Sequence, residues 1–345
     1  MSTDVIYLSQ EDVVEKVGLG METVLSVVEN VLALHTKKDV LLPSKVVLDF
    51  GEREVGRINA MLGYIGGEYK ICGVKWIGGF PKNPVKYDIP RASALIIINS
   101  AETGFPLSIM DGTYISAMRT GASTGVGAKY LARKNSTQAC IIGCGVQAIT
   151  QLQALYHVLP NLKTIKLYDI SQISAENLKK IIEQKFGSLE VFVADTAKEA
   201  VEGSDVVVTV TVADEPIVKD DWLKPGVFFS HVGSYQEEEE KVILNADKIV
   251  LDEWDQVLHR ETPLVARMYL DGKISSEKIY ADIGEIILGR KKGRESPEER
   301  IFYSPIGLGT EDVAVAYQVY KIAQEKQIGQ KLTLWDNPIF HIGRK

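Results

Sequence analysis

Residues 138–148 read Gln138-Ala139-Cys140-Ile141-Ile142-Gly143-Cys144-Gly145-Val146-Gln147-Ala148, a mostly apolar run that leads straight into a glycine turn. A helical pattern follows at once, with apolar residues recurring through 151–155. Strand, tight turn and helix in this order are typical of a dinucleotide-binding βαβ unit. Gly143 permits the turn, Gly145 lets the backbone approach a pyrophosphate, and Ala148 lets the helix pack closely on the strand. This segment therefore predicts a doubly wound parallel sheet with a dinucleotide site.

An acidic residue follows the next predicted strand, Thr164–Tyr168. This residue, Asp169, stands where dinucleotide-binding folds place the acid that binds the adenosine ribose hydroxyls. Ile170 and Ser171 come next, so no arginine stands beside the acid to bind a 2′-phosphate, and NAD is predicted rather than NADP. From the residues alone, the alternative is an ordinary βαβ crossover in which Asp169 caps the next helix.

The composition is that of a globular protein: of 345 residues, 45% are hydrophobic and 25% are charged, enough for two domains. The net charge of −7 argues against nucleic acid or an anionic membrane as the main partner. No apolar run reaches the roughly 18 residues expected of a membrane span. Residues 1–11 carry no signal-peptide pattern, and the three cysteines fit neither a disulfide framework nor a metal site. We therefore expect a cytoplasmic protein without a bound metal.

Ahead of the glycine turn, short predicted strands separated by turns occupy residues 40–99, and another spans Pro106–Met110. Such a meander is not built from βαβ units and predicts a separate first domain that binds the substrate. Apolar spacing predicts one helix from Val13 to Leu32 and a long helix from Asp111 to Leu131. The expected strands of the meander are Val46–Leu48, Arg57–Met61, Tyr69–Trp76 and Ala94–Ile98.

After the glycine turn, predicted strands and helices alternate as far as the strand Lys248–Leu251. This alternation is typical of a mainly parallel sheet with helices on both faces. The last amphipathic pattern, from Asp312 to Gln327, predicts a helix that returns to the first domain.

Several cations are candidates for binding the charged groups of a substrate. Arg119 stands among small residues, so its guanidinium either faces a cleft or forms a solvated ion pair on a helix surface. Lys75 alternates with apolar residues of a predicted strand, either as an edge residue or as a partly buried ammonium held by an anion. Lys45 and Arg57, in neighbouring strands, add positive charge.

Two further features stand in the second half of the chain. His231 ends an apolar strand, at the carboxyl edge of the sheet where ligands usually bind. It is either a hydrogen-bonded structural residue or an acid–base catalyst. The acidic run Glu237–Glu240 is interpreted as a solvated loop or the start of a helix.

The chain resembles the ornithine cyclodeaminase and μ-crystallin family over nearly its whole length. The likeness rests on four motifs in the family's order, which are Gly73–Trp76, Met118–Ser123, Ile142–Gln147 and Gly307–Asp312. The resemblance implies an α/β fold in which a Rossmann domain, residues 121–311, is inserted in a second domain. That α+β domain, residues 1–120 and 312–345, would bind the substrate and form a homodimer.

The resemblance also implies roles for individual residues. Lys75 and Arg119 would bind the carboxylate of a small amino-acid-derived substrate and take part in catalysis, with Lys45 where the cyclodeaminases have a helping arginine. Arg57 and Arg91 lie within or beside the predicted sheet and suit a substrate with several carboxylates. The residues that would bind NAD are Arg119, Thr120, Gly143, Gly145, Val146, Gln147, Asp169 and Ile170.

One position departs from the family. In the cyclodeaminases and the related alanine dehydrogenase, a strand like Val232-Gly233-Ser234 is followed by a catalytic Asp, and this chain has Tyr235 there. Ring-closing deamination of ornithine is therefore disfavoured. Tyr235 and His231 are the candidates for positioning water in an alternative reaction.

Further features resemble a siderophore-pathway branch of the family, among them Trp76–Gly78, Arg91–Ser93 and Asp252–Trp254. This likeness implies hydride transfer from the secondary amine N-(2-amino-2-carboxyethyl)-L-glutamate to NAD. Hydrolysis of the imine would then release 2-oxoglutarate and L-2,3-diaminopropionate.

Two alternatives remain open. The first is a cyclodeaminase, or a simple amino-acid or opine dehydrogenase, that uses another residue as base. The second is a non-catalytic nucleotide-binding protein of the μ-crystallin kind, which the missing Asp at position 235 favours. Lys75 and Arg119 argue against the second alternative, because a pure hormone binder has no need of a carboxylate clamp.

Overall fold

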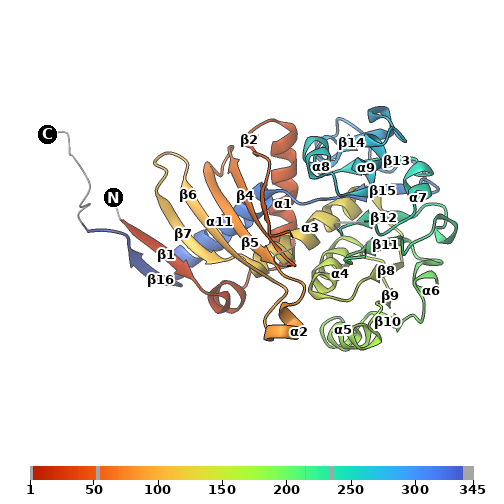
Figure 1. The fold of residues 1–345 in the computed structure, drawn as a ribbon, viewed down its shortest axis with the longest axis horizontal. Helices are drawn as coiled ribbons and strands as arrows, with labels where there is room; N and C mark the ends of the chain where they lie inside the picture. The colour runs from red at the N-terminus through yellow and green to blue at the C-terminus, as the bar shows by residue number, and fades with distance from the viewer. Residues whose placement is uncertain (1–2, 52–54, 214, 234–235, 337–345) are drawn as a thin grey trace. The chain divides into compact units, whose positions relative to one another are not determined.

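The computed structural model describes residues 3–51, 55–213, 215–233 and 236–336. The chain divides into two compact units, each with its own sheet (Figure 1). The first unit comprises Met1–Gly20, Asp39–Ser116 and Gly309–Lys345, and the second comprises Met21–Lys38 and Ala117–Leu308. The predicted boundary at residue 120 placed residues 21–38 in the first domain. They belong instead to the second unit, because helix α1 (Met21–Thr36) packs against α4 (Val146–Val158) and α10 (Ile283–Ile287).

The first unit contains a mixed sheet in the order β16-β1-β7-β6-β5-β4-β2, with β3 also paired to β4. Among the strand pairs that the described residues form in this sheet, β1 and β7 are parallel and the others are antiparallel. Helix α11 (Gly309–Lys326) packs on β4, β5 and β6, as the predicted return of the last helix requires. The strands are β1 (Asp4–Leu8), β2 (Val40–Leu41), β3 (Val46–Asp49), β4 (Arg57–Ile65), β5 (Ile71–Gly79), β6 (Ala92–Ser100), β7 (Pro106–Asp111) and β16 (Gln330–Thr333), and a short helix α2 (Asn83–Tyr87) joins β5 to β6.

The second unit contains an all-parallel sheet in the order β10-β9-β8-β11-β12-β15-β13-β14. The chain runs outward from β8 to β10 on one side and then continues with β11 and β12 on the other side, so the order reverses between β8 and β11. This is the doubly wound arrangement that the sequence predicts. Beyond β12, the late strand β15 lies between β12 and β13. The strands are β8 (Gln138–Ile142), β9 (Thr164–Tyr168), β10 (Glu190–Val193), β11 (Val206–Thr209), β12 (Phe228–His231), β13 (Lys248–Leu251), β14 (Ile279–Asp282) and β15 (Ile301–Ser304).

Helices cover both faces of the parallel sheet. On one face, a core of buried apolar side chains joins alternate residues of the strands to α6 (Ala197–Val201), α7 (Glu240–Leu244), α8 (Trp254–Arg260) and α9 (Leu264–Leu270). On the other face lies α3 (Thr113–Leu131), where Gly127 lies directly against the ring of Tyr303. Helix α5 (Gln172–Lys185) packs on β9 and β10.

One predicted helix is wrong. The pattern from Val13 to Leu32 indicates a single helix, but the structure has a short π-helical segment, Asp12–Val17, and then α1. Gly18 separates the two with a left-handed backbone, φ 62°, and donates its N–H to the carbonyl of Val13. A side chain at this backbone conformation is disfavoured, so glycine ends the first segment despite the continuous apolar spacing.

A buried carboxylate anchors the amino end of the central strand β8. Asp205 accepts hydrogen bonds from the backbone N–H groups of Thr137 (2.7 Å) and Gln138 (3.1 Å) and forms ion pairs with Arg133 and Lys224. Burial opposes ionisation, but Lys224 and the two N–H groups outweigh it and lower the pKa of Asp205 to about 2. Asp205 therefore stays charged at neutral pH and holds β8 and β11 together at the end away from the glycine turn.

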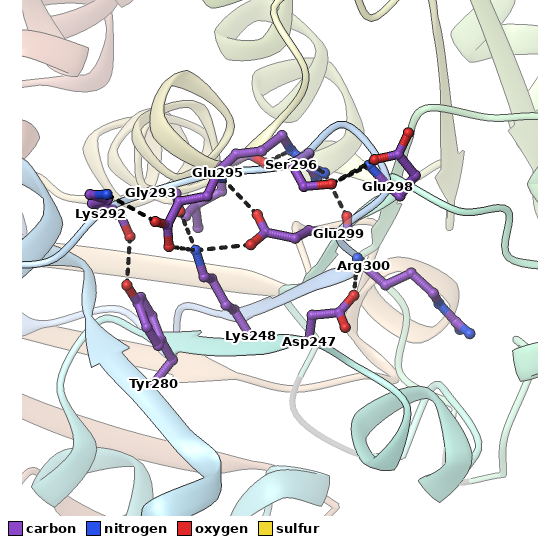
Figure 2. A network of polar contacts seen from close by, with 12 residues as sticks. Asp247, Lys248, Tyr280, Lys292, Gly293, Glu295, Ser296, Glu298, Glu299 and Arg300 are labelled. Atoms are coloured by element: carbon purple, nitrogen blue, oxygen red, sulfur yellow. Dashed lines mark hydrogen bonds and ion pairs between the residues drawn. The ribbon is translucent and has the colours of Figure 1, made fainter.

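A second polar network fixes the segment between β14 and β15 (Figure 2). The ammonium of Lys248, in β13, donates to the Gly293 carbonyl (2.6 Å) and to Glu295 (2.9 Å), and it pairs with Glu299 (3.1 Å). The same ammonium lies 4.7 Å from the centre of the Tyr280 ring. A lysine that is almost fully buried is stable here because carboxylates and an aromatic face surround it.

One carboxyl of the second unit makes folding depend on pH. Burial, and then the charges of Glu253, Glu285 and Asp255, raise the pKa of Asp282 to about 7. The unfolded carboxyl titrates near 3.8, so between these two values the folded state binds more protons than the unfolded state. This contribution to stability is therefore lost as the pH rises from about 4 through 7.

Asp282→Asn is expected to raise the free energy of unfolding at pH 8 by up to about 4 kcal/mol. The amide carries no charge, and its oxygen can still accept the N–H of Trp254, which lies 3.1 Å from Oδ1. At pH 4 both proteins have a neutral side chain there and should be equally stable. Urea unfolding at the two pH values measures the difference, and an equal gain at both would show that the carboxyl charge is not the cause.

Candidate active site

The glycine turn lies at the carboxyl end of β8 and opens helix α4. Gly143 has φ +98°, and a side chain there would meet Val210 and Thr211, which follow β11. Gly145 precedes the first residue of α4, and, apart from its chain neighbours, no described residue has an atom within 4 Å of the position that its Cβ would occupy. The first turn of a 13-residue helix thus begins beside open space, an arrangement that suits a pyrophosphate.

Asp169, at the end of β9, is tied to this turn. Its Oδ2 accepts the N–H of Cys144 (2.7 Å), and its Oδ1 accepts the N–H of Ser171 (2.8 Å). Each carboxylate oxygen has a further lone pair, so Asp169 can also accept ribose hydroxyls. Ile170 is 98% exposed and Val146 is 76% exposed, which places apolar surface beside the acid where an adenine could rest.

The predicted NAD-binding residues of α3 and α4 meet in the same unit. Gly121, in α3, packs against Thr150, in α4, so closely that a Cβ would lie 2.3 Å from the Thr150 carbonyl oxygen. Thr120 therefore lies on a helix that adjoins α4. Gln147 accepts a hydrogen bond from the hydroxyl of Thr150. The residues around the glycine turn therefore fit a dinucleotide, and the individual roles stay predictions.

Arg119 is buried rather than a solvated surface arginine. Its guanidinium lies against Gly307, where a Cβ would be 1.9 Å from one of its nitrogens. Gly307 has φ +78°, and its N–H donates to the carboxylate of Asp252 (2.7 Å). The motif Gly307–Asp312 thus begins with a glycine because the guanidinium occupies the space of a side chain. The predicted role of Arg119 in binding a carboxylate agrees with its burial and is not tested by it.

Lys75 lies in β5 on the face covered by α11, and it is only 1% exposed. Its ammonium pairs with Asp312 at 2.7 Å and donates to Ser116 at 3.0 Å. Of the two alternatives for Lys75, the structure thus shows the ammonium held by an anion. A substrate carboxylate would share this ammonium with Asp312.

Three other predicted cations belong to the same sheet. Arg57 begins β4 and pairs with Gly79, which pairs with Ala92, so Arg57 and Arg91 lie at the same end of β4–β6. Lys45 precedes Val46, which pairs with Ala60, and the next residue of β4, Met61, pairs with Lys75. Lys45 therefore lies next to the cross-strand row that contains Met61 and Lys75. The strands thus gather Arg57 and Arg91 at one end of the sheet and Lys45 beside the row of Lys75.

The end of the sheet that carries Arg57 and Arg91 extends beyond the start of α11. The helix begins over the middle of β4, where Gly63 packs against Thr310. It then runs toward Tyr69, whose ring lies 6.2 Å from that of Tyr317, and so away from Arg57. The N-terminus of this 18-residue helix therefore lies near Lys75, and its dipole favours negative charge there.

His231 ends β12 and is 1% exposed. Its Nδ1 lies 2.7 Å from Oε2 of Glu238 and 3.7 Å from Oε2 of Glu237, and both glutamates are fully buried. Burial lowers the pKa of His231, but the two carboxylates outweigh it and raise the value to about 9. The interpretation of Glu237 and Glu238 as solvated residues is wrong. Tyr235 lies outside the described residues.

Asp312, Asn59, Glu237 and Glu238 carried no predicted role. Asp312 ends the motif Gly307–Asp312, but its partner Lys75 is distant in the chain. Asn59 alternates with Arg57 and Met61 in β4, and its Oδ1 is buried without a hydrogen-bond partner among the described residues. Period-two spacing from Arg57 was the one signal that could have identified it.

The described part of the chain shows neither a metal centre nor a membrane-spanning helix. No group of three or more histidine, cysteine or acidic side chains there could hold a metal ion. Among the helices described, none combines the length and the apolar character needed to cross a membrane.

Comparison with known proteins agrees with this architecture. The model of the ornithine cyclodeaminase/mu-crystallin family matches residues 4–327, and the chain belongs to this family. The N-((2S)-2-amino-2-carboxyethyl)-L-glutamate dehydrogenase of Staphylococcus aureus is 34% identical over 97% of this chain and 100% of its own length. The alanine dehydrogenase of Archaeoglobus fulgidus is 38% identical over 95% of this chain and 98% of its own. A solved archaeal alanine dehydrogenase, a dimer with bound NAD, has a TM-score of 0.87 at 36% identity, covering 96% of this chain and all of that one.

Proposed function

We propose that this protein oxidises N-(2-amino-2-carboxyethyl)-L-glutamate with NAD and releases 2-oxoglutarate and L-2,3-diaminopropionate. The observation that carries the proposal is the set of cations on the mixed sheet, with Arg57 and Arg91 at one end of β4–β6 and Lys45 beside the row of Lys75. A substrate with three carboxylates needs several cations, whereas alanine needs one. Arginine forks suit carboxylates that are bound side-on.

The coarser activity is that of an NAD-dependent dehydrogenase or reductase that acts on an amino acid at a C–N bond. It rests on the family, on two full-length relatives with dehydrogenase activity and on the fit of the glycine turn to a dinucleotide. Asp169 without a neighbouring arginine favours NAD over NADP.

When bound, NAD supplies the acceptor for the hydride that leaves the glutamate-derived Cα. The secondary amine loses its N–H proton in the same oxidation, which gives an imine, and water then adds to this carbon so that the C–N bond breaks. Arg119 and Lys75 bind carboxylate oxygens and so orient the Cα–H. His231 is the candidate for positioning the water, because Glu238 holds its Nδ1 while its buried Nε2 has no partner among the described residues.

A homodimer is proposed as the assembly. The face of the mixed sheet opposite α11 carries an apolar row in which Val46, Ala60, Trp76 and Leu95 are paired in succession. Val46, Trp76 and Leu95 are about half exposed in the single chain. An apolar patch of this kind is typical of an interface, and an archaeal relative is a dimer.

The proposal is tested by following NAD reduction at 340 nm with a panel of amines and by identifying the products by mass. The glutamate conjugate should be turned over with release of 2-oxoglutarate and without ammonia, while L-alanine and L-ornithine should give neither NADH nor proline. Sedimentation velocity of the same preparation should show a dimer. Ammonia release from alanine, or proline from ornithine, with an inert conjugate would refute the substrate assignment.

Alanine dehydrogenase activity is the second candidate, because the A. fulgidus enzyme is similar over nearly the whole chain. Ammonia is the discriminating product, since oxidation of a primary amine releases it and cleavage of the secondary amine does not.

A further inference from the structure

The carboxylate of Glu237 bridges the ends of two neighbouring strands. Its Oε1 accepts the N–H of Thr211 (2.5 Å), two residues after β11, and its Oε2 accepts the N–H of Gly233 (3.0 Å), two residues after β12. Gly233 must be a glycine here, because a Cβ would lie 2.1 Å from Oε2. One buried side chain therefore fixes the backbone at the carboxyl ends of both strands.

The backbone that Glu237 fixes adjoins the glycine turn. The strand order reverses between β8 and β11, and ligands of doubly wound sheets bind in the crevice outside the carboxyl ends of the strands at such a point. Val210 and Thr211 contact Gly143 so closely that a side chain at Gly143 would lie 2.9 Å from them. A shift of residues 210–211 would therefore displace the turn that faces the pyrophosphate.

Glu237 is itself held firmly in place. Its carbonyl accepts the N–H groups of Ile217 (2.9 Å) and Val218 (3.0 Å). His231, whose Nδ1 lies 3.7 Å from Oε2 of Glu237, is fixed on its other side by Glu238. With its raised pKa, His231 carries positive charge at neutral pH, and this charge compensates the burial of the carboxylate.

We infer that Glu237 is a positioning residue of the NAD site, which holds the ends of β11 and β12 so that the glycine turn and residues 210–213 present their backbone to the cofactor. This inference rests on the proposed cofactor and not on the identity of the amine. Glu237 reaches the cofactor only through the backbone that it fixes, so its loss should weaken NAD binding more than it weakens the fold.

The test uses Glu237→Gln, Glu237→Asp and the matched control Glu240→Gln in the full chain. Glu240 belongs to the same acidic run, but its side chain is 43% exposed and pairs with Lys273 at the surface. NAD affinity is measured by calorimetry without any amine, and the Tm of each variant is recorded. We expect Glu237→Gln to bind NAD roughly tenfold more weakly, because an amide presents N–H to a backbone donor that needs an acceptor. Glu237→Asp should recover part of the affinity, and Glu240→Gln should match the wild type.

Equal NAD affinity in a folded Glu237→Gln variant and in the control would overturn the inference. If Glu237→Gln does not fold, hydrogen exchange of the wild-type protein decides: the amides of Thr211 and Gly233 should exchange slowly without NAD, and fast exchange would overturn the inference. A wild-type protein that binds NAD but oxidises none of the tested amines would refute the substrate assignment alone.

Discussion

Lys75→Met is expected to lower the free energy of unfolding by about 3–5 kcal/mol, because it leaves the carboxylate of Asp312 buried without its cation. Lys75 and Asp312 are 1% and 0% exposed, and their ion pair is 2.7 Å long. Asp312→Asn should cost a similar amount, since it leaves the ammonium uncompensated. Urea unfolding of the two single variants measures both effects.

The double variant Lys75→Met/Asp312→Leu separates stability from function. Replacing both charges by apolar groups of similar size removes the uncompensated charge, so stability should return to within about 1 kcal/mol of the wild type. If Lys75 also binds the substrate carboxylate, the restored fold should still have kcat/KM lowered roughly 100-fold. A stable double variant with wild-type kcat/KM would show that Lys75 has a structural role only.

This ion pair also shows where prediction from the sequence reached its limit. The alternation around Lys75 indicated either an edge residue or an ammonium held by an anion. The choice depends on a carboxylate far along the chain, and only the packing of α11 on β5 brings Asp312 to it. Contacts between distant segments leave no local periodicity, so no pattern within the strand could identify the partner.

The parallel sheet was predictable because its signal is local. The glycine turn, the acid after β9 and the alternation of strands and helices each lie within a few tens of residues, and the structure confirms a doubly wound sheet. The acidic run Glu237–Glu240 shows a case in which the local pattern gives the wrong prediction. Consecutive charges are normally solvated, but the chain buries Glu237 and Glu238 because backbone N–H groups and His231 satisfy them.

The variant Asp169→Ser/Ile170→Arg is expected to lower kcat/KM for NAD roughly 100-fold and to make NADP the better cofactor. The carboxylate of Asp169 can accept ribose hydroxyls and repels a 2′-phosphate, while an arginine at the exposed position 170 can pair with that phosphate. Asp195→Asn is the matched control, since Asp195 is an exposed acid just after the adjacent strand β10. Initial rates with both cofactors measure the change.

Comparing the two cofactors separates the predicted ribose contact of Asp169 from its contact with the glycine turn. Because Oδ2 also accepts the N–H of Cys144, part of any loss could come from a distorted glycine turn rather than from the ribose. A distorted turn would weaken NAD and NADP alike, whereas loss of ribose recognition lowers only the rate with NAD. Equal losses with both cofactors would therefore assign Asp169 to the turn, and an unchanged preference for NAD would contradict its role in recognising the ribose.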